Sequence, residues 1–118
     1  EARIAELVAA LEYSVVLSSH RAEWQKEASV VLPVATWSEE EGTYTNFQGR
    51  VQMAGKAVIP QGDTQPLWEV FAMLLYASGS SRLWLAPEDV FASMTETVPA
   101  FGNIRLEQTK LPGVLLSA

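Results

Sequence analysis

Hydrophobic residues near the start of the chain recur with the spacing of a helix. Four of them fall at i, i+3, i+4 and i+7, namely Ile4, Leu7, Val8 and Leu11. This spacing places their side chains on one face of an amphipathic helix. We therefore expect the chain to begin with a helix of that kind.

Two short runs rich in β-branched residues follow, and each has the composition of a strand buried in a parallel sheet. The first run covers Tyr13–Leu17 and the second covers Ser29–Leu32, with a helical turn or two between them. A helix–strand–helix–strand order normally gives parallel neighbours joined by a right-handed crossover. Pro33 should end the second strand because proline has no N–H to donate to a sheet.

The pattern changes after residue 41, where glycines stand at positions 42, 49, 55 and 62 with short polar and apolar alternations between them. Such spacing is typical of small extended pieces joined by turns. The segment Gln61–Thr64 then offers a turn and an N-cap for a helix.

Two helices are expected in the second half of the chain. The first carries five apolar residues at helical spacing and should end at Ser78–Gly79; these residues are Leu67, Val70, Phe71, Leu74 and Leu75. The second should begin at Ala86–Pro87, because proline fits the first helical position and the acidic Glu88 and Asp89 favour the positive end of the helix dipole. Its inward residues should be Val90, Phe91 and Met94, and Pro99 should close it.

These elements together predict an α/β fold, in which a short parallel β-α-β unit is followed by small extended pieces and two C-terminal helices. The 118 residues are about the size of one domain, and no low-complexity linker divides them. We treat residues 1–118 as a single segment with an α/β portion at 1–79 and a C-terminal helical extension at 80–118.

Composition removes several classes of function. Eight basic residues against fourteen acidic ones give a net charge of −6, which disfavours nucleic acid and anionic membrane surfaces as partners. No apolar run reaches the roughly 18 to 20 residues that a bilayer requires, so we expect no direct membrane insertion. The chain has no cysteine, which excludes thiolate catalysis and iron–sulfur ligation by its own residues.

The remaining polar residues predict neither a catalytic nor a metal site. His20 is the only histidine and is expected to be solvated or to cap a strand end. Three adjacent glutamates, Glu39–Glu41, do not converge on one point in regular structure and favour a solvated loop. Arg50 is expected to pair with a nearby glutamate, ahead of a role in ligand binding.

The segment Ser29–Leu74 resembles the molybdopterin oxidoreductase superfamily. The shared pattern is V-V-L-P, then E-x-x-G-T-x-x-N-x-E-G-R-x-Q in outline, then a turn and a tryptophan-bearing helix. Seven residues occupy the motif positions here: Glu41, Gly42, Thr43, Asn46, Gly49, Arg50 and Gln52. The Gly49-Arg50 form is similar to the branch found in the large iron–sulfur subunit of respiratory complex I.

This resemblance implies a non-catalytic structural and interaction role within NADH-quinone oxidoreductase, beside other subunits of its peripheral arm on the cytoplasmic side of the inner membrane. Iron–sulfur clusters would then lie elsewhere in the parent chain, and no cofactor would bind to this segment. The motif is interpreted as a fold signature inherited from a cofactor-binding ancestor, with polar residues that now hold loops together and an ion pair between Arg50 and Glu41.

A second interpretation makes the chain a C-terminal piece of a genuine molybdopterin enzyme such as a formate dehydrogenase. The seven motif residues would then help to hold the pterin or shape its pocket. Three departures from the superfamily pattern favour the first interpretation: Ser29 stands where aspartate is usual, Gln48 stands where glutamate is usual, and the segment Thr64–Trp68 lacks the acidic residue that commonly precedes the tryptophan. The resemblance also implies a further strand before Glu1, so we expect the isolated chain to dimerise or to be unstable.

Overall fold

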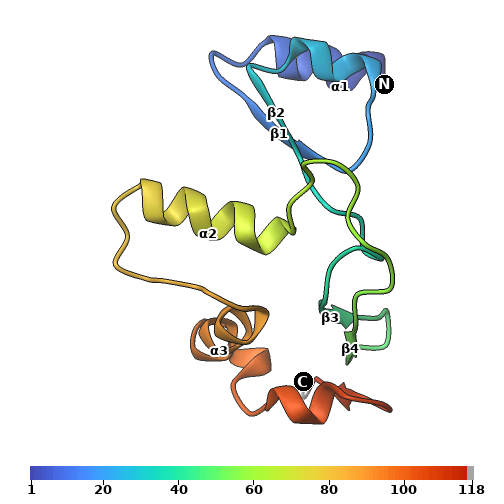
Figure 1. Ribbon diagram of the computed structural model, residues 1–118, viewed down its shortest axis with the longest axis vertical. Helices are drawn as coiled ribbons and strands as arrows, with labels where there is room; N and C mark the ends of the chain where they lie inside the picture. The colour runs from blue at the N-terminus through green and yellow to red at the C-terminus, as the bar shows by residue number, and fades with distance from the viewer. Residues whose placement is uncertain (117–118) are drawn as a thin grey trace.

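The computed structural model describes residues 1–116 and divides them between an upper and a lower unit, with one helix between the two (Figure 1). In chain order the elements are α1 (Ala2–Ala9), β1 (Val15–Ser18), the 3-10 helix η1 (Glu23–Glu27), β2 (Val30–Pro33), β3 (Gly42–Thr45), β4 (Arg50–Ala54), α2 (Leu67–Ala77), α3 (Pro87–Thr97), the 3-10 helices η2 (Pro99–Phe101) and η3 (Leu106–Thr109), and β5 (Val114–Leu115). Across this part of the chain no helix is long and apolar enough to cross a bilayer.

The upper unit contains α1 and a parallel pair of strands, as the sequence predicts. Strands β1 and β2 pair in the register Val15↔Val30 to Ser18↔Pro33, and β2 ends at Pro33. The helical turn or two expected between them is present as the short 3-10 helix η1. The connection is too short for a full crossover helix, because parallel strands joined in that way need a dozen or more residues.

Ser29, which departs from the superfamily pattern, fixes the start of this strand pair. The backbone N–H of Ser14 donates to Ser29 Oγ at 3.0 Å, and the backbone N–H of Ser29 donates to Ser14 Oγ at 3.2 Å. These reciprocal bonds satisfy two donors at the amino ends of β1 and β2. A serine in place of aspartate therefore has a structural role here.

The small extended pieces form an antiparallel sheet with the order β3-β4-β5. Strands β3 and β4 form a hairpin in the register Gly42↔Ala54 to Thr45↔Val51. Strand β5 joins the other side of β4 and pairs Val114 with Val51. The C-terminal residues, which show no period in the sequence, thus complete this sheet.

Both expected C-terminal helices are present, but different kinds of residue cap their amino ends. Helix α3 begins with Pro87 at its first position, and the Asp89 carboxylate accepts from the Ala86 backbone N–H at 3.1 Å. The cap expected within Gln61–Thr64 is absent, since α2 begins after Pro66 without a side-chain cap from its own N-cap residue. The Glu40 carboxylate instead accepts from the Leu67 N–H at 3.0 Å.

The main core lies in the lower unit, where β4, α3 and the C-terminal segment meet. Val51, Phe91 and Ile104 are buried together, with Met94 and Val114 packed against them. The inward positions expected of α3 are thus confirmed for Phe91 and Met94. Helix α2 is different, because Val70 is its only buried residue. Trp68, Ala72 and Leu75 are half-buried, and its other apolar residues are exposed.

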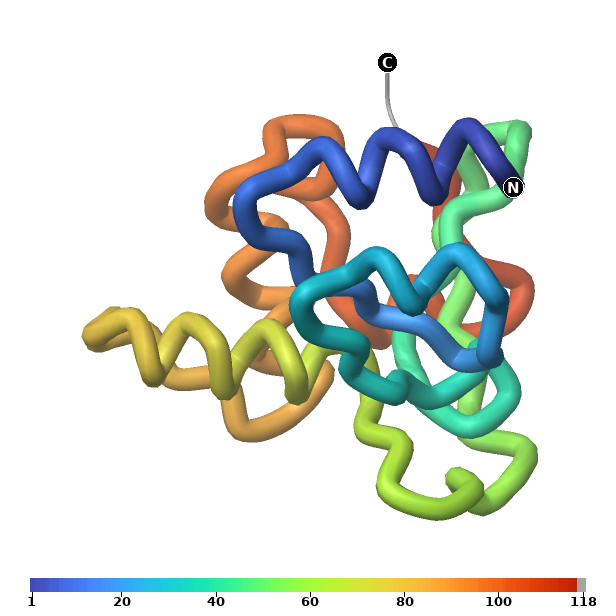
Figure 2. The backbone as a smooth tube through the Cα atoms, turned by 90° about the horizontal axis from the view of Figure 1, so that it is seen from above, coloured from blue at the N-terminus to red at the C-terminus, as the bar shows by residue number. Residues whose placement is uncertain are grey.

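The chain exposes more surface than an ordinary small domain. Its accessible area is 8455 Å², whereas a compact monomer of this mass exposes about 6300 Å². Its radius of gyration is 16.6 Å, against about 13.5 Å for a compact domain of this length. Helix α2 contributes to this excess, because it extends away from the rest of the chain in both the front and the top view (Figures 1 and 2). Such surface is suited to contact with other polypeptide.

Candidate functional site

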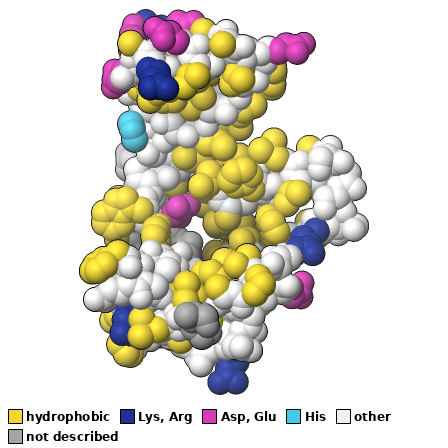
Figure 3. Space-filling model, turned by 180° about the vertical axis from the view of Figure 1, so that it is seen from behind, with side chains coloured by type: hydrophobic (Ala, Val, Ile, Leu, Met, Phe, Trp, Pro, Cys, Tyr) yellow, Lys and Arg dark blue, Asp and Glu magenta, His cyan; other side chains and the backbone are white. Residues whose placement is uncertain are grey.

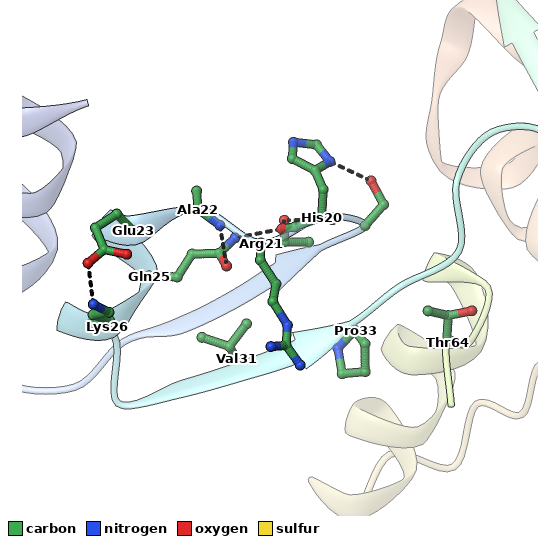
Figure 4. Close-up of a pocket in the computed structure, with 11 residues that line it drawn as sticks. His20, Arg21, Ala22, Glu23, Gln25, Lys26, Val31, Pro33 and Thr64 are labelled. Atoms are coloured by element: carbon green, nitrogen blue, oxygen red, sulfur yellow. Dashed lines mark hydrogen bonds and ion pairs between the residues drawn. The ribbon is translucent and has the colours of Figure 1, made fainter. Parts of the chain in front are cut away.

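A pocket of about 780 Å³ lies where the parallel strands β1 and β2 end (Figure 4). Both strands point their carboxyl ends towards it, since they are parallel and its lining includes Ser18 and Pro33, the last residue of each. In open parallel sheets, ligands bind in the crevice beyond the carboxyl ends of the strands. This pocket is therefore the candidate site.

Side-chain hydrogen bonds shape the loop that follows β1. Ser18 Oγ donates to the His20 carbonyl at 2.7 Å. Gln25, which is buried, donates through Nε2 to the same carbonyl at 3.0 Å and accepts through Oε1 from the Ala22 N–H at 3.1 Å. The loop is therefore held at both of its ends. His20 itself is exposed, with Nδ1 3.1 Å from Ser19 Oγ, as the sequence predicts.

The charges at the pocket favour an anion. Lys26 is paired with Glu23, the acidic residue of the lining, whereas Arg21 makes no ion pair within residues 1–116. The Arg21 side chain extends from the β1 loop towards Val31 and Pro33 on β2 (Figure 4). A guanidinium beside serine and threonine hydroxyls suits phosphate or carboxylate oxygens.

The wall opposite the β1 loop comes from a later part of the chain. Thr64 lines the pocket because the next residue, Gln65, forms a parallel bridge with Val34 immediately after β2. The Ala35 N–H donates to the Gln65 carbonyl at 2.8 Å and fixes this bridge. A long-range backbone contact therefore brings Thr64 to the site.

The central motif positions build the β3–β4 hairpin. Asn46 Oδ1 accepts from the backbone N–H groups of Gln48 at 2.9 Å and Arg50 at 3.0 Å. Gly49 has φ of 76° and donates its N–H to the Asn46 carbonyl at 2.9 Å. A positive φ favours glycine, and asparagine commonly closes such turns through its side chain. The expectation that polar motif residues hold loops together is thus confirmed for Asn46.

The expected ion pair between Arg50 and Glu41 is wrong. Arg50 lies on β4 beside β5, and its Nη1 is 3.5 Å from each of the carbonyl oxygens of Pro112 and Gly113. Gln52 Nε2 also donates to the Pro112 carbonyl at 3.3 Å. In this part of the sequence the motif therefore secures the C-terminal strand, a contact that sequence spacing does not reveal.

The spacing E-x-x-G-T places the motif glutamate at Glu39, three residues before Gly42, rather than at Glu41. Glu41, Gly42 and Thr43 lie away from this pocket. They line a separate groove beside β3. The motif is therefore split between a hairpin and a groove, and none of its seven positions lines the candidate site.

The three adjacent glutamates do not form the solvated loop that the sequence favours. Glu39 is buried, and its Oε2 accepts from the Thr36 N–H at 2.8 Å and from the Thr36 hydroxyl at 3.1 Å. Glu40 caps α2, and Glu41 is exposed. Three successive side chains point to three different places, and the part of the chain described here has no acidic or histidine cluster fit for a metal.

Acidification should weaken the fold through Glu39. The Thr36 N–H holds the pKa of the Glu39 carboxyl below its ordinary value of 4.5, while partial burial opposes this shift. A carboxyl with a lowered folded-state pKa contributes stability above its unfolded pKa, and this contribution is lost as pH falls through the folded pKa. Urea titrations would be carried out at pH values from neutral down through the folded-state pKa of Glu39. Glu39→Gln should be less stable than the original chain at neutral pH, and its free energy of unfolding should fall less on acidification. Glu41→Gln is the control, and parallel curves for the original and Glu39→Gln chains would contradict the assignment.

The sequence indicates the strands but not the site that they position. Ser19, Arg21 and Thr64 line the pocket, yet none was singled out from the sequence as a candidate. The available signal was the polar run Ser18–Arg21 directly after a predicted parallel strand. The general rule for ligand position in parallel sheets would have selected that run. For Thr64 the sequence predicts only a turn and a helix N-cap, and no place at a ligand site.

Comparison with known proteins identifies the family. Over 106 residues the chain is 33% identical to the F420-dependent formate dehydrogenase subunit alpha of Methanocaldococcus jannaschii, a match that covers 88% of this chain and 16% of the relative. Over 103 residues it is 34% identical to the NADPH-Fe(3+) oxidoreductase subunit alpha of Geobacter sulfurreducens, with coverage of 86% and 12%. The chain therefore spans about a sixth or less of the length of these relatives.

The family match covers most of the chain. Residues 1–77 match the molybdopterin oxidoreductase family, and they include the pocket and the hairpin. The strand pair, the hairpin and α2 all lie within the match, which agrees with the mixed α/β fold. The relatives named above do not single out the complex I branch that Gly49-Arg50 suggests. The chain belongs to the molybdopterin oxidoreductase family.

Proposed function

We propose that this chain is part of the catalytic subunit of a molybdopterin enzyme of the formate dehydrogenase kind, and that the pocket beyond β1 and β2 helps to hold its pterin cofactor. The observation that carries the proposal is the position of this pocket beyond the strand ends, with Arg21 unpaired beside it. The chain belongs to the molybdopterin oxidoreductase family, and its relatives include formate dehydrogenase alpha subunits. We therefore favour the function as part of a pterin-binding enzyme over the function as a cofactor-free segment of complex I.

The residues at the pocket fit the chemistry of a phosphate-bearing pterin. Arg21 offers planar N–H donors to phosphate oxygens, and the hydroxyls of Ser19 and Thr64 offer further polar contacts. The metal carried by such a cofactor would supply the redox centre that accepts electrons from the substrate. This chain's residues would bind and orient one part of the cofactor. The hairpin formed by the motif would support the surrounding fold.

A second candidate function is the structural role within complex I. The sequence Gln48-Gly49-Arg50 favours it, because the form with Gly-Arg resembles that branch. Under this function the parent chain would hold iron–sulfur clusters elsewhere and would lie in the peripheral arm on the cytoplasmic side of the membrane. Under either function we propose other subunits as partners, since the relatives are designated alpha subunits.

The metal content of the parent protein distinguishes the two functions. The native protein would be isolated with an antibody against this chain, and its iron, molybdenum and tungsten would be quantified together. Stoichiometric molybdenum or tungsten is expected. Abundant iron with neither metal would reject the pterin enzyme in favour of the complex I role.

The same measurement on variants tests the pocket. Arg21→Ala in the parent protein should lower the molybdenum or tungsten content several-fold, because a cation facing the cofactor is lost. Arg3→Ala, on the exposed surface of α1, is the matched control and should leave the metal content unchanged. Equal metal content in both variants would show that the pocket does not hold the cofactor.

A further inference from the structure

Gln25 differs from the other residues of η1 because its side chain is both polar and buried. It is 8% exposed, whereas Glu23 and Lys26 on the same 3-10 helix are exposed. Burial of a polar group is costly unless the group is hydrogen-bonded. Both the donor and the acceptor of the Gln25 amide therefore need partners, and the β1 loop (residues 19–22) supplies them.

The Gln25 amide bridges the two peptide groups on either side of Arg21 (Figure 4). Its Nε2 donates to the His20 carbonyl at 3.0 Å, and this carbonyl belongs to the peptide group before Arg21. Its Oε1 accepts from the Ala22 N–H at 3.1 Å, and this N–H belongs to the peptide group after Arg21. Because each peptide group is planar, holding both of them fixes the backbone dihedral angles of Arg21.

The Arg21 backbone has little other support. Its own N–H and C=O make no hydrogen bond within residues 1–116. The loop lies at the surface, where the only histidine of the chain, His20, is visible in cyan in the view from behind (Figure 3). Ser18 Oγ also donates to the His20 carbonyl, at 2.7 Å, but it does not reach the peptide group after Arg21. The direction in which the Arg21 side chain leaves the loop therefore depends mainly on Gln25.

The chemistry of the bridge requires an amide. The His20 carbonyl can only accept a hydrogen bond and the Ala22 N–H can only donate one, so the side chain between them must offer one donor and one acceptor. A glutamate at position 25 would lose the donor, and a methionine of similar shape would lose both groups. An arginine that is ordered only when a ligand binds gives weaker binding than one that is ordered beforehand.

We propose that Gln25 is a positioning residue, which sets the backbone of Arg21 so that its guanidinium faces the pocket and binds a phosphate-type anion there. Gln25 acts through Arg21 and needs no contact of its own with the ligand. The identification of this anion as the phosphate of a pterin cofactor rests on the proposed function. The positioning of Arg21 rests on the two contacts of the Gln25 amide.

The test is a double-mutant cycle on the full-length parent protein, produced in cells that make no pterin cofactor so that the pocket is open. Calorimetric titration with inorganic pyrophosphate would give the dissociation constant of each variant. Arg21→Ala should raise this constant about tenfold, because charge-assisted hydrogen bonds are lost. Gln25→Met should raise it about fivefold, because Arg21 must then be ordered on binding.

The double variant separates positioning from a merely structural role. In the Arg21→Ala background, Gln25→Met should change the dissociation constant by less than about twofold, since the residue that Gln25 positions is already gone. A structural role would give the same loss in both backgrounds. Gln25→Asn keeps the amide but should reach only one of the two peptide groups, so it replaces Gln25→Met in the cycle if that variant does not fold.

Gln108→Met is the matched control. Gln108 Oε1 accepts from the Arg105 N–H at 2.7 Å at the start of η3, as Gln25 Oε1 accepts from the Ala22 N–H at the start of η1. Gln108 lies outside the pocket lining, so its substitution removes a similar contact and should leave the dissociation constant unchanged.

Three results would overturn the proposal: no pyrophosphate binding by the original protein, an unchanged dissociation constant in Arg21→Ala, or equal effects of Gln25→Met in the two backgrounds. None of these measurements depends on molybdenum or tungsten. Absence of both metals from the native protein would reject the proposed function, whereas the pyrophosphate cycle would still decide the role of Gln25. The two failures are therefore distinguishable.

Discussion

Phe91→Ala should lower the free energy of unfolding by about 3 kcal/mol, because truncation of a buried phenylalanine removes apolar contacts and leaves a cavity. Phe91 is 6% exposed and lies in the cluster with Val51 and Ile104, where α3 meets the sheet and the C-terminal segment. Few hydrophobic side chains are buried in the described part of the chain, so this cluster should account for a large share of its stability.

Denaturant titration with a matched phenylalanine tests this expectation. Phe71 lies on α2 and is 46% exposed, so Phe71→Ala should cost less than about 1 kcal/mol. Both substitutions remove the same atoms from a helix, and only burial differs between them. Equal losses would show that α2 packs as deeply as α3 in solution, which would contradict the exposure of Phe71.

The contrast between α2 and α3 shows how much of the fold a hydrophobic pattern can predict. Both helices have apolar residues at helical spacing, and both were expected from it. The pattern identifies the face that avoids water, but it does not reveal whether this chain or another polypeptide covers that face. Phe91 is covered within the chain, whereas Phe71 is not.

The candidate site shows a second limit of sequence reasoning. The parallel strands were predicted from two β-branched runs, and the polar residues after the first run are adjacent in sequence. Thr64 joins them only through the Val34↔Gln65 bridge, and Arg50 reaches Pro112 only because β5 pairs with β4. Such contacts depend on how distant segments pair, and local spacing does not encode that information.

Gly113→Ala should lower the free energy of unfolding by roughly 3 kcal/mol through backbone strain and steric overlap. Gly113 has φ of 83°, and a Cβ there would lie 2.5 Å from the Val51 carbonyl oxygen and from Gln52 Cγ. The Gln52 side chain can rotate away, but the Val51 carbonyl belongs to β4 and cannot. The turn before β5 would therefore have to move, and the contacts of Arg50 and Gln52 with this turn would weaken.

Gly79→Ala separates the two contributions. Gly79 has φ of 85°, nearly the same as Gly113, yet a Cβ at this position would meet no atom within 4 Å. Gly79→Ala should therefore cost only the conformational term of about 1 kcal/mol. Urea titration of both variants gives the steric contribution as the difference between them. Equal losses would mean that β5 is not held against β4, and the Arg50 and Gln52 side chains would then have no structural role in securing the C-terminal strand.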